Sequence, residues 1–227
     1  SKCILCGRCV SACQKLAGTC VLDFNQRGFE TYIGTAQNHP LEDSGCIYCG
    51  KCIQACPVGA LREKEQIDDV LELLDGKHYY TVVQVAPSVR AALGEEFGYA
   101  IGTNVEGKMY ASLQKLGFDD VTDTNYSADV TIMEEGTEFI HKFTDFKNGD
   151  TSALPLFTSC SPGWIRYIEQ YYPEFLPNLS SCKSPQQMQG ALTKHYYSAK
   201  LGIPKENIRV VSVMPCTAKK FEITRPE

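Results

Sequence analysis

From residue 65 onward, hydrophobic and polar positions follow patterns that predict strands and helices in turn. Apolar, β-branched runs predict buried strands at 79–86 and 208–213, and shorter strands are expected at 119–124 and 154–158. Helical patterns separate them, at 65–74, 89–97, 108–116, 128–143, from 164 to about 171, and 185–201. This alternation indicates an α/β domain with a parallel sheet and crossover helices.

The first 56 residues have a different character, because they hold nine of the twelve cysteines of the chain. Eight of the nine form two runs with the same C-x2-C-x2-C-x3-C spacing: Cys3, Cys6, Cys9 and Cys13, then Cys46, Cys49, Cys52 and Cys56. This is the spacing of a bacterial two-cluster ferredoxin, an α+β module. Between the runs, residues 21–24 and 27–33 predict a short hairpin.

The spacing predicts how the thiolates are shared between two [4Fe–4S] clusters. Three thiolates within seven residues wrap one cluster, and the fourth, on a helical turn, points toward the other cluster. We therefore predict two crossed ligand sets: Cys3, Cys6, Cys9 and Cys56, and Cys46, Cys49, Cys52 and Cys13. Zinc sites favour paired C-x2-C units, and a disulfide-rich secreted domain fits the regular spacing poorly.

Composition narrows the class of protein further. The 227 residues are 43% hydrophobic and 22% charged, as in a globular protein, and no run approaches 18 apolar residues, so no membrane span is expected. A net charge of −5 removes the electrostatic case for nucleic-acid binding. We predict two domains, a ferredoxin-like domain at 1–64 and an α/β domain at 65–227.

Three of the expected strands end in residues with unusual chemistry. They run into Ala86-Pro87-Ser88, Thr158-Ser159-Cys160 and Met214-Pro215-Cys216. Ligands of open parallel sheets bind at the carboxyl ends of strands, so Cys160 and Cys216 are candidates for one metal centre. The alternative interpretation is a pair of buried structural cysteines.

Residues 158–164 (TSCSPGW) and 214–222 (MPCTAKKFE) resemble the first two signature motifs of [FeFe]-hydrogenases. Residues 85–90, 131–135 and 183–187 support the resemblance, as does the double ferredoxin module, so that it covers essentially the whole chain. The resemblance implies reversible reduction of protons to H2 at an H-cluster, in which a [4Fe–4S] cubane is joined to a two-iron unit.

The resemblance also implies roles for individual residues. Cys216 corresponds to a cubane ligand, and Lys219 to a lysine that contacts a cyanide of the two-iron unit. The same unit is lined by Pro87, Ser88, Gln186 and Met214. Protons are relayed by Glu138, Glu135, Ser180 and Cys160. Without the motifs, the glutamates 134, 135 and 138 would be interpreted as a solvated helix face.

Two departures from the family pattern affect these expectations. Ser161 stands where the family has a cubane cysteine, so either its oxygen binds iron, or Cys182 replaces the missing sulfur, or the site is altered for sensing. Nothing resembles the third signature motif. We therefore expect an α/β domain incomplete at its C-terminus, an H-cluster only in a completed chain, and no activity from these residues alone.

The leading hypothesis is a ferredoxin- or NAD-linked hydrogenase. Its expected electron partners are ferredoxin or other hydrogenase subunits, and its expected location is the cytoplasm of an anaerobe or a hydrogen-producing organelle. The alternatives are a hydrogenase-like iron–sulfur assembly protein, a sensory relative and a simple ferredoxin-type electron carrier.

Overall fold

The computed structural model describes residues 2–226, which pack as two compact units. One unit contains the residues up to Lys64 together with Ser161–Leu176 and the segment from Cys216 onward. The other contains Glu65–Cys160 and Pro177–Pro215. This grouping by packing differs from the contiguous domains predicted at 1–64 and 65–227, which therefore stay a prediction.

The first unit is built around two similar helical turns, each preceded by a cysteine loop. Helix α1 (Arg8–Ala12) runs on into a π-helical turn at Cys13–Ala17, and helix α2 is Lys51–Ala55. Strands β1 (Asp23–Asn25) and β2 (Tyr32–Gly34) pair antiparallel, which confirms the predicted hairpin. The core of the unit is small and contains two of the cysteines, its members being Cys9, Val10, Cys13, Val21 and Leu22.

Helices α7 (Pro162–Tyr171) and α10 (Ala218–Glu222) complete this unit. Arg166 of α7 donates to the carbonyl of Cys46, and the Tyr171 hydroxyl donates to the carbonyl of Gly45. The helix lies so close that a Cβ on Gly163 would be 3.1 Å from the carbonyl oxygen of Ile47. Polar side chains thus satisfy backbone carbonyls of the second cysteine loop and hold α7 against it.

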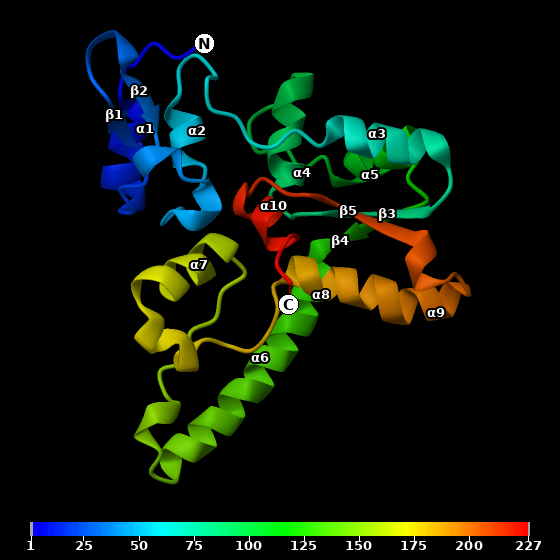
Figure 1. The fold of residues 1–227 in the computed structure, drawn as a ribbon. Helices are drawn as coiled ribbons and strands as arrows, with labels where there is room; N and C mark the ends of the chain where they lie inside the picture. The colour runs from blue at the N-terminus through cyan, green and yellow to red at the C-terminus, as the bar shows by residue number, and fades with distance from the viewer. Residues whose placement is uncertain (1, 227) are drawn as a thin grey trace. The chain divides into compact units, whose positions relative to one another are not determined.

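The second unit contains a parallel three-stranded sheet in the order β4-β3-β5, in which β3 (Tyr80–Val85) is central (Figure 1). Val85 lies opposite Asp123 of β4 (Asp120–Asp123) and opposite Val213 of β5 (Ile208–Val213). Parallel alignment therefore brings the carboxyl ends of all three strands to one edge of the sheet.

Helices cover both faces of this sheet (Figure 1). Val83 and Val85 pack in a core with α3 (Ile67–Gly76), α4 (Val89–Ala92) and α5 (Glu106–Leu116). Gln84 points the other way, because side chains alternate along a strand; it bonds Gln186 of α8 (Pro185–Leu192) and Thr124, where α6 (Thr124–Lys147) begins. Helix α8 continues through a π-helical turn at Thr193–Tyr197 into α9 (Ser198–Leu201). The ferredoxin-like module and the parallel α/β architecture confirm the predicted fold class.

Two expected elements differ from the structure. Residues 154–158 do not form a strand of the sheet, because Pro155 has no N–H and only Phe157 makes a bridge, with Leu179. Helix α6 begins at Thr124, which had been expected in a strand, and continues to Lys147. The Asp123 side chain caps it by accepting from the N–H of Asn125, so the strand turns directly into the helix.

Short 3₁₀ turns connect the main elements, at Gly28–Glu30, Ala36–Asn38, Leu41–Asp43, Leu93–Phe97, Thr151–Ala153, Pro173–Asn178 and Lys205–Asn207. Within the described span of 2–226, no helix has both the length and the apolar character needed to cross a bilayer.

Candidate functional site

The two cysteine loops have the same backbone conformation. Gly7 and Gly50, which follow the second cysteine of each run, both have φ 71°, and Leu5 and Tyr48 have φ 54° and 55°. In each loop the N–H before the second cysteine donates to the sulfur of the first cysteine across 3.4 Å, from Leu5 to Cys3 and from Tyr48 to Cys46. Two left-handed residues per loop make the chain wrap around a centre.

The first loop lines a cavity of about 590 Å³. Its cysteines are Cys3, Cys6 and Cys9 from the first run and Cys56 from the second. The backbone N–H of Ala60 donates to the Cys56 sulfur across 3.2 Å. Backbone N–H groups, chiefly that of Leu61, lower the pKa of the Cys56 thiol, which favours the thiolate that a cluster needs.

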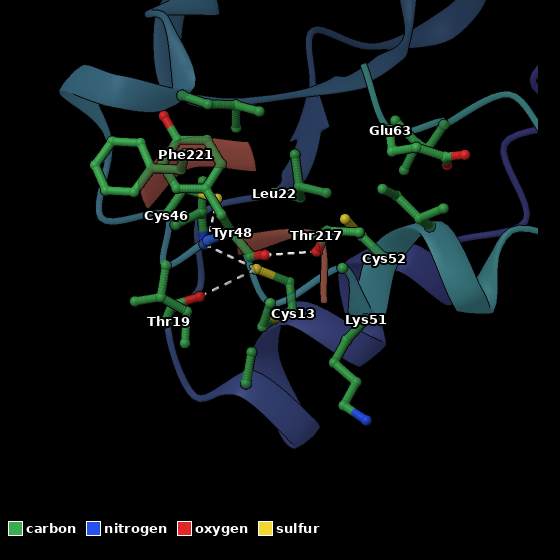
Figure 2. Close-up of a pocket in the computed structure, with 18 of the residues that line it drawn as sticks. Cys13, Thr19, Leu22, Cys46, Tyr48, Lys51, Cys52, Glu63, Thr217 and Phe221 are labelled. Carbon is green, nitrogen blue, oxygen red and sulfur yellow. Dashed lines mark hydrogen bonds between the residues drawn. The ribbon is translucent and has the colours of Figure 1, made fainter. Parts of the chain in front are cut away.

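The second loop lines a cavity of about 410 Å³ with the opposite crossing, since Cys46, Cys49 and Cys52 are joined there by Cys13 (Figure 2). The Cys13 sulfur accepts from the N–H of Val21 at 3.2 Å and lies 3.4 Å from the Thr19 hydroxyl. Burial raises the pKa of Cys52 to about 11 and also raises the pKa of Cys46. Without a metal, these thiols therefore resist deprotonation. Positively charged iron would offset the free-energy cost of forming the thiolates.

The donors fit two [4Fe–4S] clusters better than single ions or disulfides. All twelve cysteines lie within residues 2–226, and none of them forms a disulfide. In the same span no three His, Cys, Asp or Glu side chains lie close enough to hold one metal ion. A zinc ion needs four donors within about 2.3 Å of one point, whereas a cubane gives each thiolate an iron of its own.

In the sheet unit, the strand ends bring several predicted site residues to one edge. Pro87 and Ser88 follow β3 and are exposed, and Met214 follows β5 and is half-buried. The N–H of Ala86 donates to the carbonyl of Val213 across 3.0 Å, which extends the pairing to the point where both segments leave the sheet. Gln186 is only 4% exposed, and its carbonyl accepts from Gln84 at 3.1 Å.

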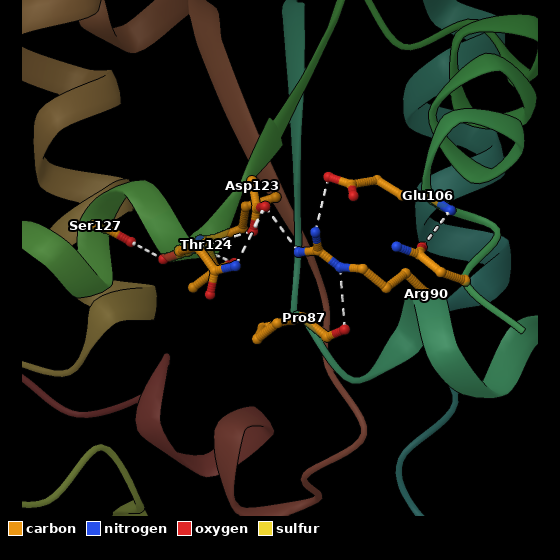
Figure 3. Close-up of polar contacts among 9 residues, drawn as sticks. Pro87, Arg90, Glu106, Asp123, Thr124 and Ser127 are labelled. Atoms are coloured by element: carbon orange, nitrogen blue, oxygen red, sulfur yellow. Dashed lines mark hydrogen bonds and ion pairs between the residues drawn. The ribbon is translucent and has the colours of Figure 1, made fainter. Parts of the chain in front are cut away.

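Arg90 connects three elements at this edge (Figure 3). Its Nε donates to the carbonyl of Pro87 at 3.1 Å, and its other two nitrogens form ion pairs of 2.7 Å with Glu106 and Asp123. The Arg90 side chain is 14% exposed and that of Asp123 25%, so this pair is partly shielded from water, whereas the Glu106 side chain is 37% exposed. Because Asp123 also caps α6, Arg90 ties the Pro87 turn to the start of the helix that carries the predicted relay glutamates.

Two of the predicted relay residues are in direct contact. The Ser180 hydroxyl donates to the Glu138 carboxylate across 2.6 Å, and the N–H of Ser181 donates to the same carboxylate at 3.2 Å. Glu135 lies one turn earlier on α6, on the same face. Burial raises the pKa of Glu135, and the charge of Glu138 raises it further, so Glu135 keeps a proton at higher pH than an ordinary glutamate.

Cys182 lies beside this pair, with its sulfur 4.0 Å from the Glu138 carboxylate and its N–H donating to the Ser180 hydroxyl at 3.1 Å. Burial raises the pKa of the Cys182 thiol, and the negative charge of Glu138 raises it too. Bound iron would offset the cost of deprotonation, as at Cys46 and Cys52, so the raised pKa does not decide whether Cys182 binds a cluster. The hypothesis that Cys182 replaces the missing cubane sulfur stays a prediction.

The remaining predicted residues are placed less directly. Cys160 is exposed, three residues after Phe157, whose carbonyl accepts from the N–H of Ser180 at 2.8 Å. Ser161, Cys216 and Lys219 belong to the cysteine-loop unit. There the Lys219 ammonium pairs with Glu222 at 3.0 Å, and both side chains are nearly buried. The roles that the resemblance gives to these residues stay predictions.

Sequence reasoning missed Arg90 as an organising residue and gave no role to Thr217 or Arg166. Arg90 lies within segment 85–90 and Thr217 within segment 214–222, so the motifs include both residues but do not reveal which residues they contact. Most of those partners, among them Asp123 for Arg90 and Tyr48 for Thr217, lie far away in sequence, and no periodicity marks them.

Comparison with known proteins gives this arrangement a family. Residues 79–227 match the family described as iron only hydrogenase large subunit, C-terminal domain, and residues 2–60 match the 4Fe-4S dicluster domain. The chain therefore belongs to the iron-only hydrogenase large-subunit family, which confirms the resemblance, and the dicluster match confirms the prediction of two [4Fe–4S] clusters.

The chain is 50% identical to the NADP-reducing hydrogenase subunit HndD of Solidesulfovibrio fructosivorans and 49% identical to iron hydrogenase 1 of Clostridium pasteurianum. Each match covers 100% of this chain but 39% of the relative, so the chain spans about two fifths of their length. A cytosolic Fe-S cluster assembly factor, narfl of Danio rerio, is 39% identical over 64% of this chain and 35% of its own length.

A solved structure, the apo [FeFe]-hydrogenase HydA1 from Chlamydomonas reinhardtii in a variant form, is similar in fold. Its TM-score is 0.67 at 42% sequence identity, and the match covers 71% of this chain and 41% of that one.

Proposed function

We propose that the full-length protein is an [FeFe]-hydrogenase that catalyses the reversible reaction 2H⁺ + 2e⁻ ⇌ H2. The observation that carries this proposal is the 2.6 Å hydrogen bond from Ser180 to Glu138, with Glu135 one turn away on the same helix face. A hydroxyl can accept one proton while it donates another, so this group of side chains is suited to moving protons. A plain electron carrier has no use for such a group.

The cofactors of the proposed enzyme are the two [4Fe–4S] clusters and an H-cluster. When bound, the H-cluster supplies the redox chemistry that joins protons and electrons. The chain's own contribution is to hold cluster thiolates, Cys216 among them, and to keep Pro87, Ser88, Gln186 and Met214 in place for the two-iron unit. Ser161 stays a candidate oxygen donor to the cubane.

The similarity to an assembly factor supports a second candidate, a non-catalytic protein that assembles iron–sulfur clusters. Such a protein needs cluster-binding cysteines but no pathway for protons. The contact between Ser180 and Glu138 favours the hydrogenase. Ser180 also donates its N–H to Phe157, three residues before Cys160.

The test is hydrogen evolution from reduced methyl viologen, together with iron per chain. Full-length protein is purified without oxygen after co-expression with the hydrogenase maturation factors. A hydrogenase should evolve H2 and contain at least about 14 iron atoms, about six of them in the H-cluster, whereas an assembly protein or an electron carrier should lack the H-cluster iron and evolve none.

The electron partner in this proposal is a ferredoxin or another hydrogenase subunit, and the relative named as an NADP-reducing hydrogenase subunit supports a link to a nicotinamide cofactor. The proposed location is the cytoplasm of an anaerobe or a hydrogen-producing organelle, since reduced thiols and clusters persist in reducing compartments. Growth of the source cells with and without oxygen, followed by fractionation, tests this.

A further inference from the structure

The residue after Cys216 is in contact with the second cysteine loop. The Thr217 hydroxyl donates to the backbone carbonyl of Tyr48 across 2.7 Å (Figure 2). Tyr48 is bonded to Cys49 along the chain, as Thr217 is to Cys216. One hydrogen bond therefore joins the side chain of the residue after Cys216, the predicted cubane ligand, to the backbone carbonyl of the residue before Cys49, a predicted ligand of the second cluster.

This close approach depends on a glycine. A Cβ on Gly50 would lie 2.7 Å from the Thr217 hydroxyl oxygen, and Gly50 also has φ 71°. Any other residue at position 50 would push Thr217 away and strain the backbone. The absence of a side chain at Gly50 thus makes room for the Thr217 side chain.

Aromatic packing holds the two segments together on either side of the hydrogen bond. The rings of Tyr48 and Phe221 stack with centroids 4.6 Å apart and planes 14° from parallel. The Arg166 guanidinium lies 4.7 Å from the Phe221 ring and donates to the carbonyl of Cys46 at 2.7 Å. These contacts pack beside the hydrogen bond and involve neither the Thr217 hydroxyl nor the Tyr48 carbonyl.

We propose that the Thr217 hydroxyl is the bridge that couples the second [4Fe–4S] cluster electronically to the cubane held by Cys216. This inference rests on the proposed function, which supplies the cubane. Electron coupling decays less along covalent and hydrogen bonds than across van der Waals gaps. In the step, the reduced second cluster loses one electron and the oxidised cubane gains it; the Thr217 proton stays on its oxygen and no bond breaks.

The test compares Thr217→Val, which keeps the shape but removes the hydroxyl, with Thr217→Ser, which keeps the hydroxyl. Full-length protein is made without the maturation factors, so that electron arrival is measured without hydrogenase activity. Dithionite reduces the clusters in a rapid-freeze experiment, and electron paramagnetic resonance follows the cubane signal. We expect the cubane to be reduced severalfold more slowly in Thr217→Val, at unchanged iron content and cluster potentials, and at the original rate in Thr217→Ser.

Phe221→Leu is the packing control, because it removes the stack and leaves the hydroxyl and its acceptor in place. It should reduce the cubane at the original rate; a delay as large as that of Thr217→Val would overturn the proposal, as would equal rates for Thr217→Val and Thr217→Ser. Should Thr217→Val lose iron, the pair Thr217→Ala and Thr217→Ser gives the same comparison. Original protein that shows no cluster signal assignable to Cys216, identified by its loss in Cys216→Ala, also overturns the proposal.

Exchange between H2 and D2O in the fully matured protein separates this proposal from the proposed function. The exchange takes place at the active centre without net electron flow. It should persist in Thr217→Val while viologen-driven H2 evolution falls. If the original protein showed no exchange, the proposed hydrogenase activity would be refuted. The cubane reduction rates would then still test whether Thr217 couples the second cluster to the cubane.

Discussion

Ser180 donates its hydroxyl hydrogen to Glu138 across 2.6 Å, although the two residues are 42 positions apart in sequence. The serine also accepts from the N–H of Cys182, so its oxygen is both donor and acceptor. The contact joins α6 to the segment that pairs with Phe157, just before Cys160. Two members of the predicted proton relay are therefore in direct contact.

Replacing Ser180 by Ala should lower H2 evolution strongly, because no hydroxyl remains to pass a proton to or from Glu138. It should also cost about 1–2 kcal/mol of stability, since Glu138 and the N–H of Cys182 both lose a partner. Ser180→Thr keeps the hydroxyl and is the matched control. Viologen-driven evolution rates and urea unfolding measure the two effects; equal activity in the Ala and Thr variants would contradict the relay.

Glu135→Gln should stabilise the protein increasingly as the pH rises. The pKa of Glu135 is raised by burial and by Glu138, so the folded chain holds this proton more tightly than the unfolded chain. Stability is therefore lost as the pH rises through the interval above the usual glutamate pKa of about 4.3, and glutamine escapes that loss. Thermal unfolding measured from pH 4 to about pH 7 tests this, with Glu134→Gln, on an exposed side chain of the same helix, as the control. A difference in melting temperature that does not change with pH would refute it.

Cys182→Ala should leave the iron content of matured full-length protein unchanged. The Cys182 sulfur lies 4.0 Å from the Glu138 carboxylate, and the Cys182 N–H donates to the Ser180 hydroxyl, so this residue is already engaged with the predicted relay. Iron analysis and the cubane's paramagnetic signal provide the measurement, with Cys216→Ala as the positive control that should lose the cubane. Loss of about four iron atoms from the Cys182 variant would show that this sulfur is a ligand after all.

Cys56→Ala should damage the cluster of the other run. Cys56 lines the cavity of Cys3, Cys6 and Cys9, while Cys13 lines that of Cys46, Cys49 and Cys52. Removing Cys56 should therefore alter the cluster of the first loop, and Cys13→Ala that of the second. Redox titration followed by paramagnetic resonance distinguishes the two signals. If each variant instead damages the cluster of its own run, the crossed assignment is wrong.

Arg90→Ala should destabilise the sheet unit by about 1–2 kcal/mol, mainly because the partly shielded Asp123 carboxylate loses its cation, while the more exposed Glu106 contributes little. Arg90→Lys should recover part of this stability, though a lysine cannot reach three partners at once. In matured protein, the turn at Pro87 should shift and move the carbonyl and cyanide infrared bands of the two-iron unit. Unchanged bands in Arg90→Ala would show that the clamp stabilises the fold without positioning that turn.

The crossed cysteine sets were predictable because ligand spacing is local: three thiolates in seven residues leave the fourth to reach elsewhere. The strands at 79–86 and 208–213 were predictable because both are rich in β-branched apolar residues, and β3 is also buried along almost its whole length. The expected strand at 154–158 was wrong because Pro155 removes a backbone donor from an otherwise apolar segment. Helix α6 was placed too late because the cap at Asp123 depends on a side-chain hydrogen bond.

The sequence by itself determined the family and the two cluster sites, since both depend on short motifs whose spacing fixes their chemistry. The identity of the relay residues stays a prediction. Only the tertiary structure decided that Arg90 joins Pro87 to Asp123 and that Cys182 faces Glu138. It also decided that Thr217 reaches Tyr48, 169 positions away. The reason is physical: these contacts form where separate segments pack together, and the packing geometry that selects their partners leaves no periodic mark on either segment.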